Sequence, residues 1–557
     1  MKAKDVLALL ISEKPDPLKD VRVTGPLDLS SIGVPGPVRV HNCVFEDAVD
    51  ATDARFARSV RFINCSFEKG LSLAHARIDG PLDLSGSVLK PMAGAAEMPF
   101  HDLHVEGCIE GTRLHVECGL NFSDLECGAA FRLHGAKIGG DLVLDSAFIE
   151  GELDLGDCSQ HDEKPAARTE VSGILKCARS HIESRVLLIG SLLGGATFEQ
   201  TQVGGTMLLC SGYYTNHVLE IGAPESYSYS LSLLGASLHG NLEIRGAKLD
   251  GYLRISNAEI RCNLVLKSDR NIPTGQSFQT FLGSKKESPS LRLASASVRG
   301  AVYIHNVNFT GIFEASNADV ALIEIDEATI NSLRKLSDKM PDGVLAIEGL
   351  KFGELKLVKS VGENKFEALP VDAYLGLLEL SVFDEGTYAN VENWLRRSAK
   401  DDAADSVFRR MRSLETKARP IGLRRFLFAL FGFFYGYGTR NRWGCIFWLF
   451  TFAVTVLMFW DGRGLDKIEP SNLPVPGSAT PMEPNWVDKA GVIFRIHLPM
   501  IAWFSDPEWK PTAETFPMYP CFRLRYDAVA YTLLVLNFAN VPLIIASLSG
   551  LLKRRGS

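Results

Sequence analysis

Two neighbouring stretches of the chain determine its fold: residues 235–244 read GASLHGNLEI, and residues 246–255 read GAKLDGYLRI. They align with a step of eleven residues, and apolar and polar residues alternate within each. A period of two is typical of short β-strands that bury one face, whereas a helix needs a period of 3.6. Glycine and alanine at the joins permit tight corners and close approach of neighbouring strands. These stretches therefore predict stacked short strands.

The eleven-residue step recurs through much of the first 330 residues, for example at Leu29, Val40, Ala51, Phe62, Leu73 and Leu84. Residues 42–45 (NCVF) reappear 22 residues later as residues 64–67 (NCSF), which indicates two steps for each full coil. We therefore predict a mainly β protein whose residues 21–330 form a β-solenoid with about 22 residues per coil. Residues 1–20 are predicted to form an N-terminal capping helix, and residues 331–369 a cap or linker.

Four polar or proline-bearing segments interrupt the rhythm, at residues 90–101, 160–172, 211–230 and 268–290. In a solenoid such insertions leave the coil as surface loops. We expect an unknown protein or small-molecule ligand to be recognised there.

Residues 247–251 read AKLDG, and this A-x-L-x-G phrase resembles the pentapeptide-repeat family. The resemblance implies a quadrilateral, right-handed β-helix with small and apolar side chains facing inward. The sequence departs from the strict family pattern by one extra residue for each pair of pentapeptides.

The carboxyl third contains two long apolar stretches. Residues 443–460 (WGCIFWLFTFAVTVLMFW) carry no charge and have Trp at both ends, and about 27 Å of helix nearly matches the hydrocarbon core of a bilayer. Residues 528–552 form the second predicted span, between Asp527 and the basic tail at residues 553–557. The sequence therefore predicts an α-helical, two-span transmembrane domain after the solenoid.

Basic residues flank both spans on one side. Residues 396–442 hold twelve Lys and Arg against four Asp and Glu, and residues 553–555 read KRR. The positive-inside rule then places both termini in the cytoplasm, residues 461–527 outside, and the protein in the inner (cytoplasmic) membrane. The eleven cysteines, which form no CxxC, also fit a reducing compartment for the solenoid. Residues 370–425 are predicted to form a basic helical hairpin, and residues 426–442 an interfacial segment on the membrane lipid.

The order of these segments carries a second resemblance. A helical hairpin, a GYG turn at residues 436–438, a span, an A-x-x-x-F-x-x-x-x-P stretch at residues 490–499 and a span ending in LSGLLK resemble bacterial two-span proteins with pentapeptide-like repeats. Such proteins are variously labelled ion-channel-like or membrane-associated oxidoreductase. The resemblance implies one of these two activities.

Polar residues inside the membrane domain are the main functional candidates. Asn537, Asn540 and Ser547 share one face of the second span, where side-chain amides need partners. Either a homo-oligomer with a pore or packing within one protomer supplies them. The short apolar segment at residues 490–504 is interrupted by polar and bulky residues, and it forms either a re-entrant pore element or a surface helix. Its candidate residues are Arg495, His497, Pro499 and Trp503.

The densest group of soft metal ligands is His101, His104, Cys108, His115 and Cys118, followed by Cys127. The strand phase directs Leu103 and Val105 inward and spreads the ligands over different faces, so we predict no metal site and no cofactor. The chain contains no Walker loop, HExxH or GxSxG motif, and we predict no enzymatic activity. The formal charge of −7 argues against nucleic acid as a partner.

Together these features predict a membrane-anchored β-solenoid sensor or binding protein coupled to an oligomeric two-span membrane domain that acts as a gated ion channel or pore. Two alternatives stay open: a non-conducting, membrane-tethered scaffold for protein–protein interaction, and a membrane-associated oxidoreductase.

Overall fold

The computed structural model places most of the chain. It describes residues 1–12, 15–156, 167–211, 217–225, 228–270, 277–283, 289–340, 343–362, 365–370, 372–435, 437, 439, 442–467, 483–498, 509–516 and 524–548. The chain divides into two compact units, Met1–Asn390 and Val391–Ser557. The two units are described separately below.

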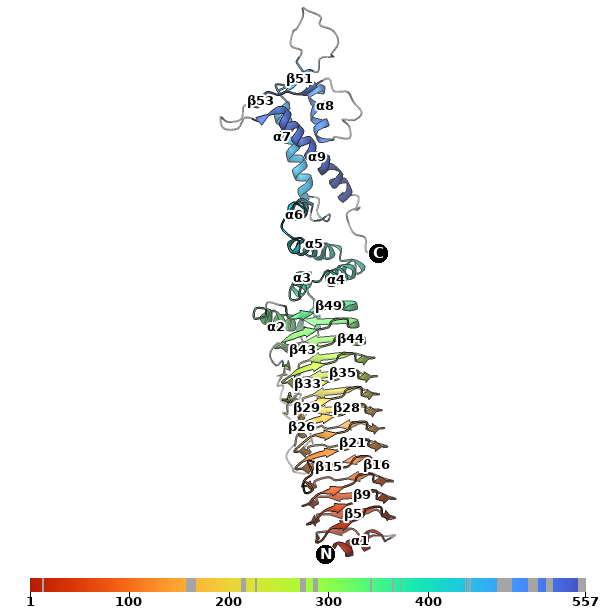
Figure 1. Cartoon of the computed structure of the whole chain (residues 1–557). Coiled ribbons are helices and arrows are strands. Elements are labelled where there is room, and N and C mark those ends of the chain that lie inside the picture. Colours follow the sequence, from red (N-terminus) through yellow and green to blue (C-terminus); the bar gives the residue numbers. More distant parts are fainter. Residues whose placement is uncertain are drawn as a thin grey trace, which may run out of the picture. The chain divides into compact units, whose positions relative to one another are not determined.

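The first unit is a β-solenoid built from short parallel strands, stacked coil upon coil (Figure 1). One coil contains the four strands β8 (Arg55–Phe56), β9 (Val60–Ile63), β10 (Ser66–Phe67) and β11 (Leu71–Ser72). The alternation that the sequence shows sets the burial, because β9 buries Val60 and Phe62 and exposes the arginine between them. The predicted mostly β, solenoid architecture is confirmed.

Neighbouring coils pair in register with a step of 22 residues. Val40 of β5 (Val38–His41) lies opposite Phe62 of β9 in the parallel ladder. The step lengthens where the chain is interrupted: His104 lies opposite Arg77, and Ser297 lies opposite Glu259. The coil thus keeps its register across the insertions, and the extra residues leave the ladder between strands.

The corners of the coil use residues with left-handed backbone conformation. Asn42 and Asn64, 22 residues apart, have φ of 54° and 55°. The Nδ2 of Asn42 donates to Oδ1 of Asp20 at 3.0 Å, and the Nδ2 of Asn64 donates to Oδ1 of Asn42 at 3.4 Å. Asparagine adopts this conformation more readily than most residues. At the next coil Gly86 (φ +69°) is required, because a Cβ there would lie 2.1 Å from Oδ1 of Asn64.

One helix closes the N-terminal end of the solenoid, and another interrupts the solenoid near its other end. At the N-terminal end, α1 (Ala3–Leu10) buries Ala3, Val6 and Leu10, and β1 (Leu18–Lys19) already pairs with β5. At the other end, α2 (Glu327–Ser337) begins at Asp326, whose Oδ1 accepts a hydrogen bond from the Thr329 amide at 2.9 Å. The parallel ladder continues beyond the predicted boundary at residue 330.

That continuation consists of β49 (Lys351–Gly362), which pairs in parallel with β47 (Asp319–Asp326). β50 (Lys365–Ala368) then turns back antiparallel on β49, and α3 (Asp372–Leu378) follows. α2 is therefore an insertion within the solenoid, since the ladder resumes after it. The strand period fades locally in sequence because a helix interrupts it.

The helical unit begins within α4 (Glu385–Arg397), which crosses the boundary between the units. Its further elements are α5 (Asp401–Ala418), α6 (Leu423–Tyr435), α7 (Arg442–Phe459), β51 (Leu465–Lys467), α8 (Trp486–His497), β52 (Trp509–Pro511), β53 (Thr515–Phe516), β54 (Leu524–Arg525) and α9 (Tyr526–Leu548). Among the described residues, one helix is long and apolar enough to cross a membrane, at Tyr526–Ile545 within α9. The apolar part of α7, Cys445–Phe459, is shorter.

Candidate functional site: a polar layer between α7, α8 and α9

The three helices α7, α8 and α9 pack around a shared apolar core. Its buried members are Met458, Phe459, Leu465, Val492, Ile493, Ile496, Trp509, Tyr526, Ala530 and Leu533. Phe459 and Tyr526 meet at one end of this core, with ring centroids 5.7 Å apart. α7 ends and α9 begins at this contact, so the two helices run antiparallel.

The outward faces of α7 and α9 are also apolar. Leu457 and Phe450 of α7 are 77% and 65% exposed, and Val535 and Phe538 of α9 are 68% and 58% exposed. A contiguous apolar exterior is unfavourable in water and favourable in lipid. Four polar side chains of these helices turn the other way, into the unit: Thr451, Thr455, Asn537 and Asn540 are buried.

Three buried polar side chains form a layer that we call the polar layer: His497 of α8 and Asn537 and Asn540 of α9. They are 0%, 0% and 5% exposed. The Nδ2 of Asn537 donates to the carbonyl oxygen of Ile496 at 3.3 Å, which joins α9 to the last turn of α8. The imidazole of His497 lies against α7, with its ring centroid 5.2 Å from that of Phe452.

Several hydrogen-bonding atoms of the polar layer lack a partner within the described part of the chain. The Nδ1 of His497 lies 3.1 Å from the carbonyl oxygen of Ile493. A carbonyl only accepts, so Nδ1 carries a proton. The Oδ1 of Asn537 and both amide atoms of Asn540 are buried without a described partner. Each such atom costs about 1–3 kcal/mol, so the layer requires water, an ion or another polar group.

The carboxyl-terminal end of α8 lies beside the polar layer. The helix starts in a capping box, in which Asn485 Oδ1 accepts from the Asp488 amide at 2.9 Å and Asp488 Oδ2 accepts from the Asn485 amide at 3.0 Å. Its twelve residues extend about 18 Å, roughly half of a hydrocarbon core. The carboxyl terminus of α8, which is the negative end of the helix dipole, therefore lies beside Asn537.

The sequence predicts Asn537, Asn540 and His497 as candidate residues, but not the hydrogen bond between Asn537 and Ile496 that joins α9 to α8. The sequence predicts that a partner for Asn537 comes from either a second chain or the same protomer, and in the structure the carbonyl oxygen of Ile496 in the same chain accepts its hydrogen bond. Arg495 lies half exposed on α8. Pro499 and Trp503 lie outside the described residues, as does the side chain of Ser547. Trp448 and Phe452 of α7, which contact His497, were not predicted, because no local sequence pattern indicates which face of α7 meets α8.

The histidines and cysteines of the β-solenoid, which we also call the rod, occupy separate positions. His101 and His115 are half exposed, and the Nδ1 of His104 pairs with Oε2 of Glu126 at 2.6 Å. Cys108 and Cys118 lie half buried at corners, and Cys127 is buried. Within the described ranges, no three His, Cys, Asp or Glu side chains come together as a metal site.

Burial makes the core thiols unreactive. Desolvation raises the pKa of Cys65 to about 12 and that of Cys127 to about 11. A thiol with such a pKa is almost fully protonated at neutral pH, and the thiolate is the reactive form. Cys65 and Cys127 are therefore packing residues of the core.

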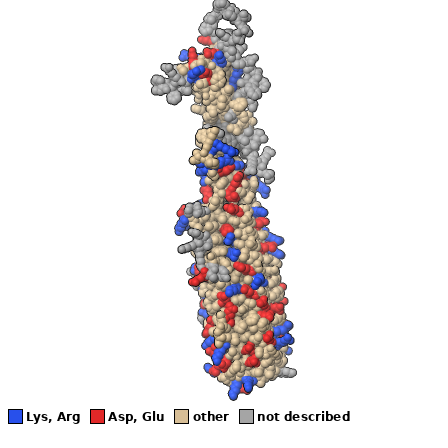
Figure 2. All heavy atoms as spheres, in the orientation of Figure 1, with Lys and Arg blue, Asp and Glu red and all other residues tan. Residues whose placement is uncertain are grey.

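The rod's surface carries interleaved acidic and basic side chains on the face that Figure 2 shows. Many pair across coils: Arg132 donates to Glu110 at 2.9 Å and to Glu152 at 3.0 Å, residues 22 and 20 positions away. Residues 27–29 and 82–84 both read LDL, and their aspartates stabilise turns: Asp28 accepts from the Ser30 amide at 2.9 Å, and Asp83 accepts from the Ser85 amide at 3.0 Å. These acids hold corners as well as facing solvent.

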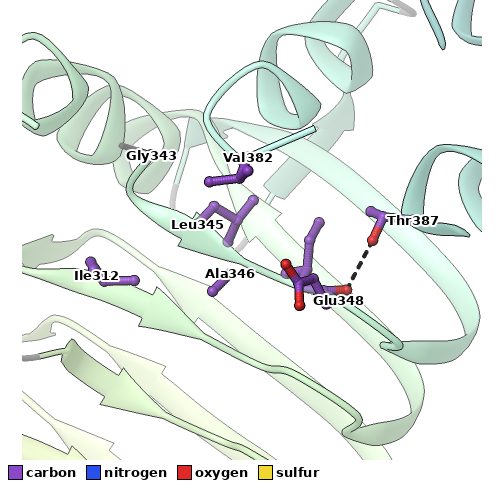
Figure 3. Close-up of a pocket in the computed structure, with 8 residues that line it drawn as sticks. Ile312, Gly343, Leu345, Ala346, Glu348, Val382 and Thr387 are labelled. Atoms are coloured by element: carbon purple, nitrogen blue, oxygen red, sulfur yellow. Dashed lines mark hydrogen bonds between the residues drawn. The ribbon is translucent and has the colours of Figure 1, made fainter. Parts of the chain in front are cut away.

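A small pocket lies at the C-terminal end of the solenoid (Figure 3). Its volume is about 80 Å³, and its lining includes Leu345, Glu348, Val382 and Thr387. The Oγ1 of Thr387 donates to the carbonyl oxygen of Ile347 at 3.2 Å, which closes one wall. Sites for organic ligands usually exceed about 300 Å³, so this pocket fits a few water molecules.

Comparison with known proteins supports the repeat. A family model described as "Pentapeptide repeats (9 copies)" matches residues 41–88. No curated protein and no solved structure was found to match the chain. The matched residues span β6 (Val44–Phe45) to β13 (Leu82–Asp83), where the 22-residue register is uninterrupted. Residues 41–88 are thus similar to pentapeptide repeats, and they form consecutive coils of the β-solenoid of the first unit.

Proposed function

We propose that this chain is a membrane-anchored binding protein. α7 and α9 cross the bilayer, α8 enters it as a half-span, and the pentapeptide-repeat rod binds a ligand outside the membrane. The observation that carries the proposal is the inverted polarity of the helical unit: Leu457 and Val535 face outward, while Asn537 and His497 are buried. Such an arrangement suits lipid and not water.

The distribution of basic residues supports an inner-membrane protein whose rod lies in the cytoplasm. Twelve Lys and Arg stand against four Asp and Glu over residues 396–442, directly before α7, and residues 553–555 are basic. Cytoplasmic flanks of spans are enriched in basic residues. Ligand binding on the rod would then report cytoplasmic conditions to the membrane unit.

We propose further that the membrane unit conducts ions through the polar layer in an oligomer, gated by the rod. The half-helix α8 ends beside Asn537, whose acceptor Oδ1 lacks a described partner. Discontinuous helices that end within the membrane commonly form ion sites. The rival is a non-conducting tether, which the bond between Asn537 and Ile496 favours because it holds the polar layer inside one protomer.

The test uses the purified full-length chain in liposomes. The double variant Asn537→Leu/Asn540→Leu removes the amides from the layer, and Thr532→Val is the matched control, since the exposed Thr532 bonds only to its own helix at Ala528. We expect cation flux in wild type and in the control, and at least about tenfold less flux in the double variant. Retention of the chain in alkali-washed membranes tests the anchoring separately.

A separate experimental result would contradict each part of the proposal. Release of the chain from membranes by alkaline carbonate would remove the anchoring. Firm retention with no flux in any sample would leave the tether and remove the channel. Flux that is equal in the double variant would exclude the polar layer as the path.

A further inference from the structure

The connection between α5 and α6 displays apolar side chains to the exterior of the helical unit. Ile421 is 93% exposed, the highest value among the large apolar side chains that the structure describes, and Leu423 and Phe426 are 74% and 61% exposed. Pro420 ends α5 by forcing Arg419 into an extended conformation (φ −69°, ψ 148°). We call residues 417–426 the basic loop.

Basic side chains surround these apolar tips. Lys417 and Arg424 are exposed, and Arg419 and Arg425 are half exposed. The guanidinium carbon of Arg419 lies 4.3 Å from the ring centroid of Phe428, and Nη1 of Arg425 donates to the carbonyl oxygen of Arg419 at 3.2 Å. These contacts fix two of the cations beside the apolar tips.

The single carboxylate of residues 412–425 is already neutralised. Glu415 accepts from Arg412 through Oε2 and from Arg419 through Oε1, each at 2.5 Å. Burial raises the pKa of Glu415, but these two hydrogen bonds outweigh it and hold the pKa below its ordinary value. The segment holds five Lys and Arg against this one acid, so the basic loop is a positive surface.

We propose that the basic loop docks on an anionic phospholipid leaflet. Ile421, Leu423 and Phe426 enter the boundary between headgroups and acyl chains, and Lys417 and Arg424 lie at the level of the phosphates. Exposed apolar side chains surrounded by cations suit a membrane surface, where hydrocarbon lies beneath negatively charged headgroups. An acidic protein would match the charge but would need an apolar groove for a protruding tip. The inference rests on the proposed function in one respect, because α6 leads into the proposed span α7.

The experiment measures lipid selectivity of the full-length chain. Detergent-solubilised protein is equilibrated with equimolar phosphatidylglycerol and phosphatidylcholine, and the retained lipids are quantified by mass spectrometry. We expect phosphatidylglycerol to be enriched on wild type, and each removed charge to lower that enrichment about fivefold. Lys417→Gln/Arg424→Gln should therefore reduce it about 25-fold. Arg39→Gln/Arg61→Gln, which removes two exposed charges from the rod, should leave it unchanged.

A second pair of variants separates charge from folding. Arg424→Lys keeps the charge and should keep the enrichment, whereas Ile421→Ser/Leu423→Ser should reduce the total retained lipid while the preference for phosphatidylglycerol persists. Equal retention of the two lipids by wild type would overturn the proposal. So would an equal loss in the rod control, or displacement of all bound lipid by a polyglutamate peptide. Carbonate extraction of membranes that contain the same variants, before any detergent is added, tests anchoring by α7 and α9 independently, so failure of lipid selectivity is distinguishable from failure of the proposed function.

Discussion

The rings of Phe45 and Phe67 stack face to face, with centroids 4.9 Å apart and planes 6° apart. They lie 22 residues apart, and Phe67 sits directly opposite Phe45 in the parallel ladder. Their separation matches the distance between hydrogen-bonded strands, so the ladder itself sets the stack. Phe62 meets Phe67 edge-on at 5.3 Å. The sequence repeat thus becomes a column of like side chains in the core.

The solenoid should not tolerate a charged side chain at an inward position of a strand, but it should tolerate one at the neighbouring outward position. Val40 is 0% exposed, whereas its neighbour Arg39 on β5 is exposed. Val40→Asp places an unpaired carboxylate in the column and should lower the free energy of unfolding by several kcal/mol. Arg39→Asp should change it by less than about 0.5 kcal/mol. Urea titrations of the two full-length variants, followed by circular dichroism, give the comparison, and equal midpoints would contradict the observed burial.

The left-handed corners make a second prediction. Asn64→Val forces a β-branched residue to φ 55° and should cost about 1–3 kcal/mol, whereas Asn64→Gly should cost less. Gly86→Ala should be destabilising in the wild type because its Cβ meets Oδ1 of Asn64. Adding Asn64→Gly to Gly86→Ala should then recover part of the loss, as thermal unfolding can show. No recovery would mean that the backbone conformation alone, and not this contact, requires the glycine.

Stability should depend on pH through His134. A hydrogen bond from its Nε2 to Oδ2 of Asp154 at 2.9 Å raises the pKa of His134 above 6.5, against the opposing effect of burial. The charged form is therefore favoured in the folded state. Its contribution is complete below the unfolded pKa and is lost as pH rises through the folded value. The melting temperature of wild type relative to His134→Gln should accordingly fall as pH increases above about 6.5. A constant difference would exclude this linkage.

Membrane topology can be checked with two native cysteines. Cys262 is exposed on the rod, and Cys521 lies in the predicted external segment 461–527. An impermeant maleimide should label Cys521 in intact cells and Cys262 only after permeabilisation, as mass spectrometry of peptides can show. The reverse pattern, with both sites reactive in detergent, would invert the orientation.

The two asparagines of the polar layer should differ from each other. Asn537→Leu leaves the carbonyl oxygen of Ile496 without its partner and should cost about 1–3 kcal/mol. Asn540→Leu removes an amide with no described partner and should be neutral or stabilising in thermal scans of the detergent-purified chain. Equal destabilisation by both would indicate that Asn540 holds a polar group of its own, such as bound water or a second chain.

Periodicity made much of the rod predictable. Most strands of the rod span only a few residues, so the alternation of Val38, Val40, Val60 and Phe62 is visible locally. The 22-residue step follows because like residues stack on like. The apolar stretches that became α7 and α9 were likewise visible, because a run of uncharged residues is a local property. The boundary at residue 330 was not, since β49 rejoins the ladder after α2 has interrupted the pattern.

The sequence by itself therefore determined the coil length, the inward and outward phases of the strands, and the location of the apolar helices. Tertiary structure decided which corner residues stack, as Asn64 does on Asn42, and which buried polar groups meet. Asn537 and Ile496 are 41 residues apart, and the segments around them have no common period that would bring them together. Local patterns specify which face of an element is apolar, but the choice of partner for a polar atom depends on packing among helices distant in sequence.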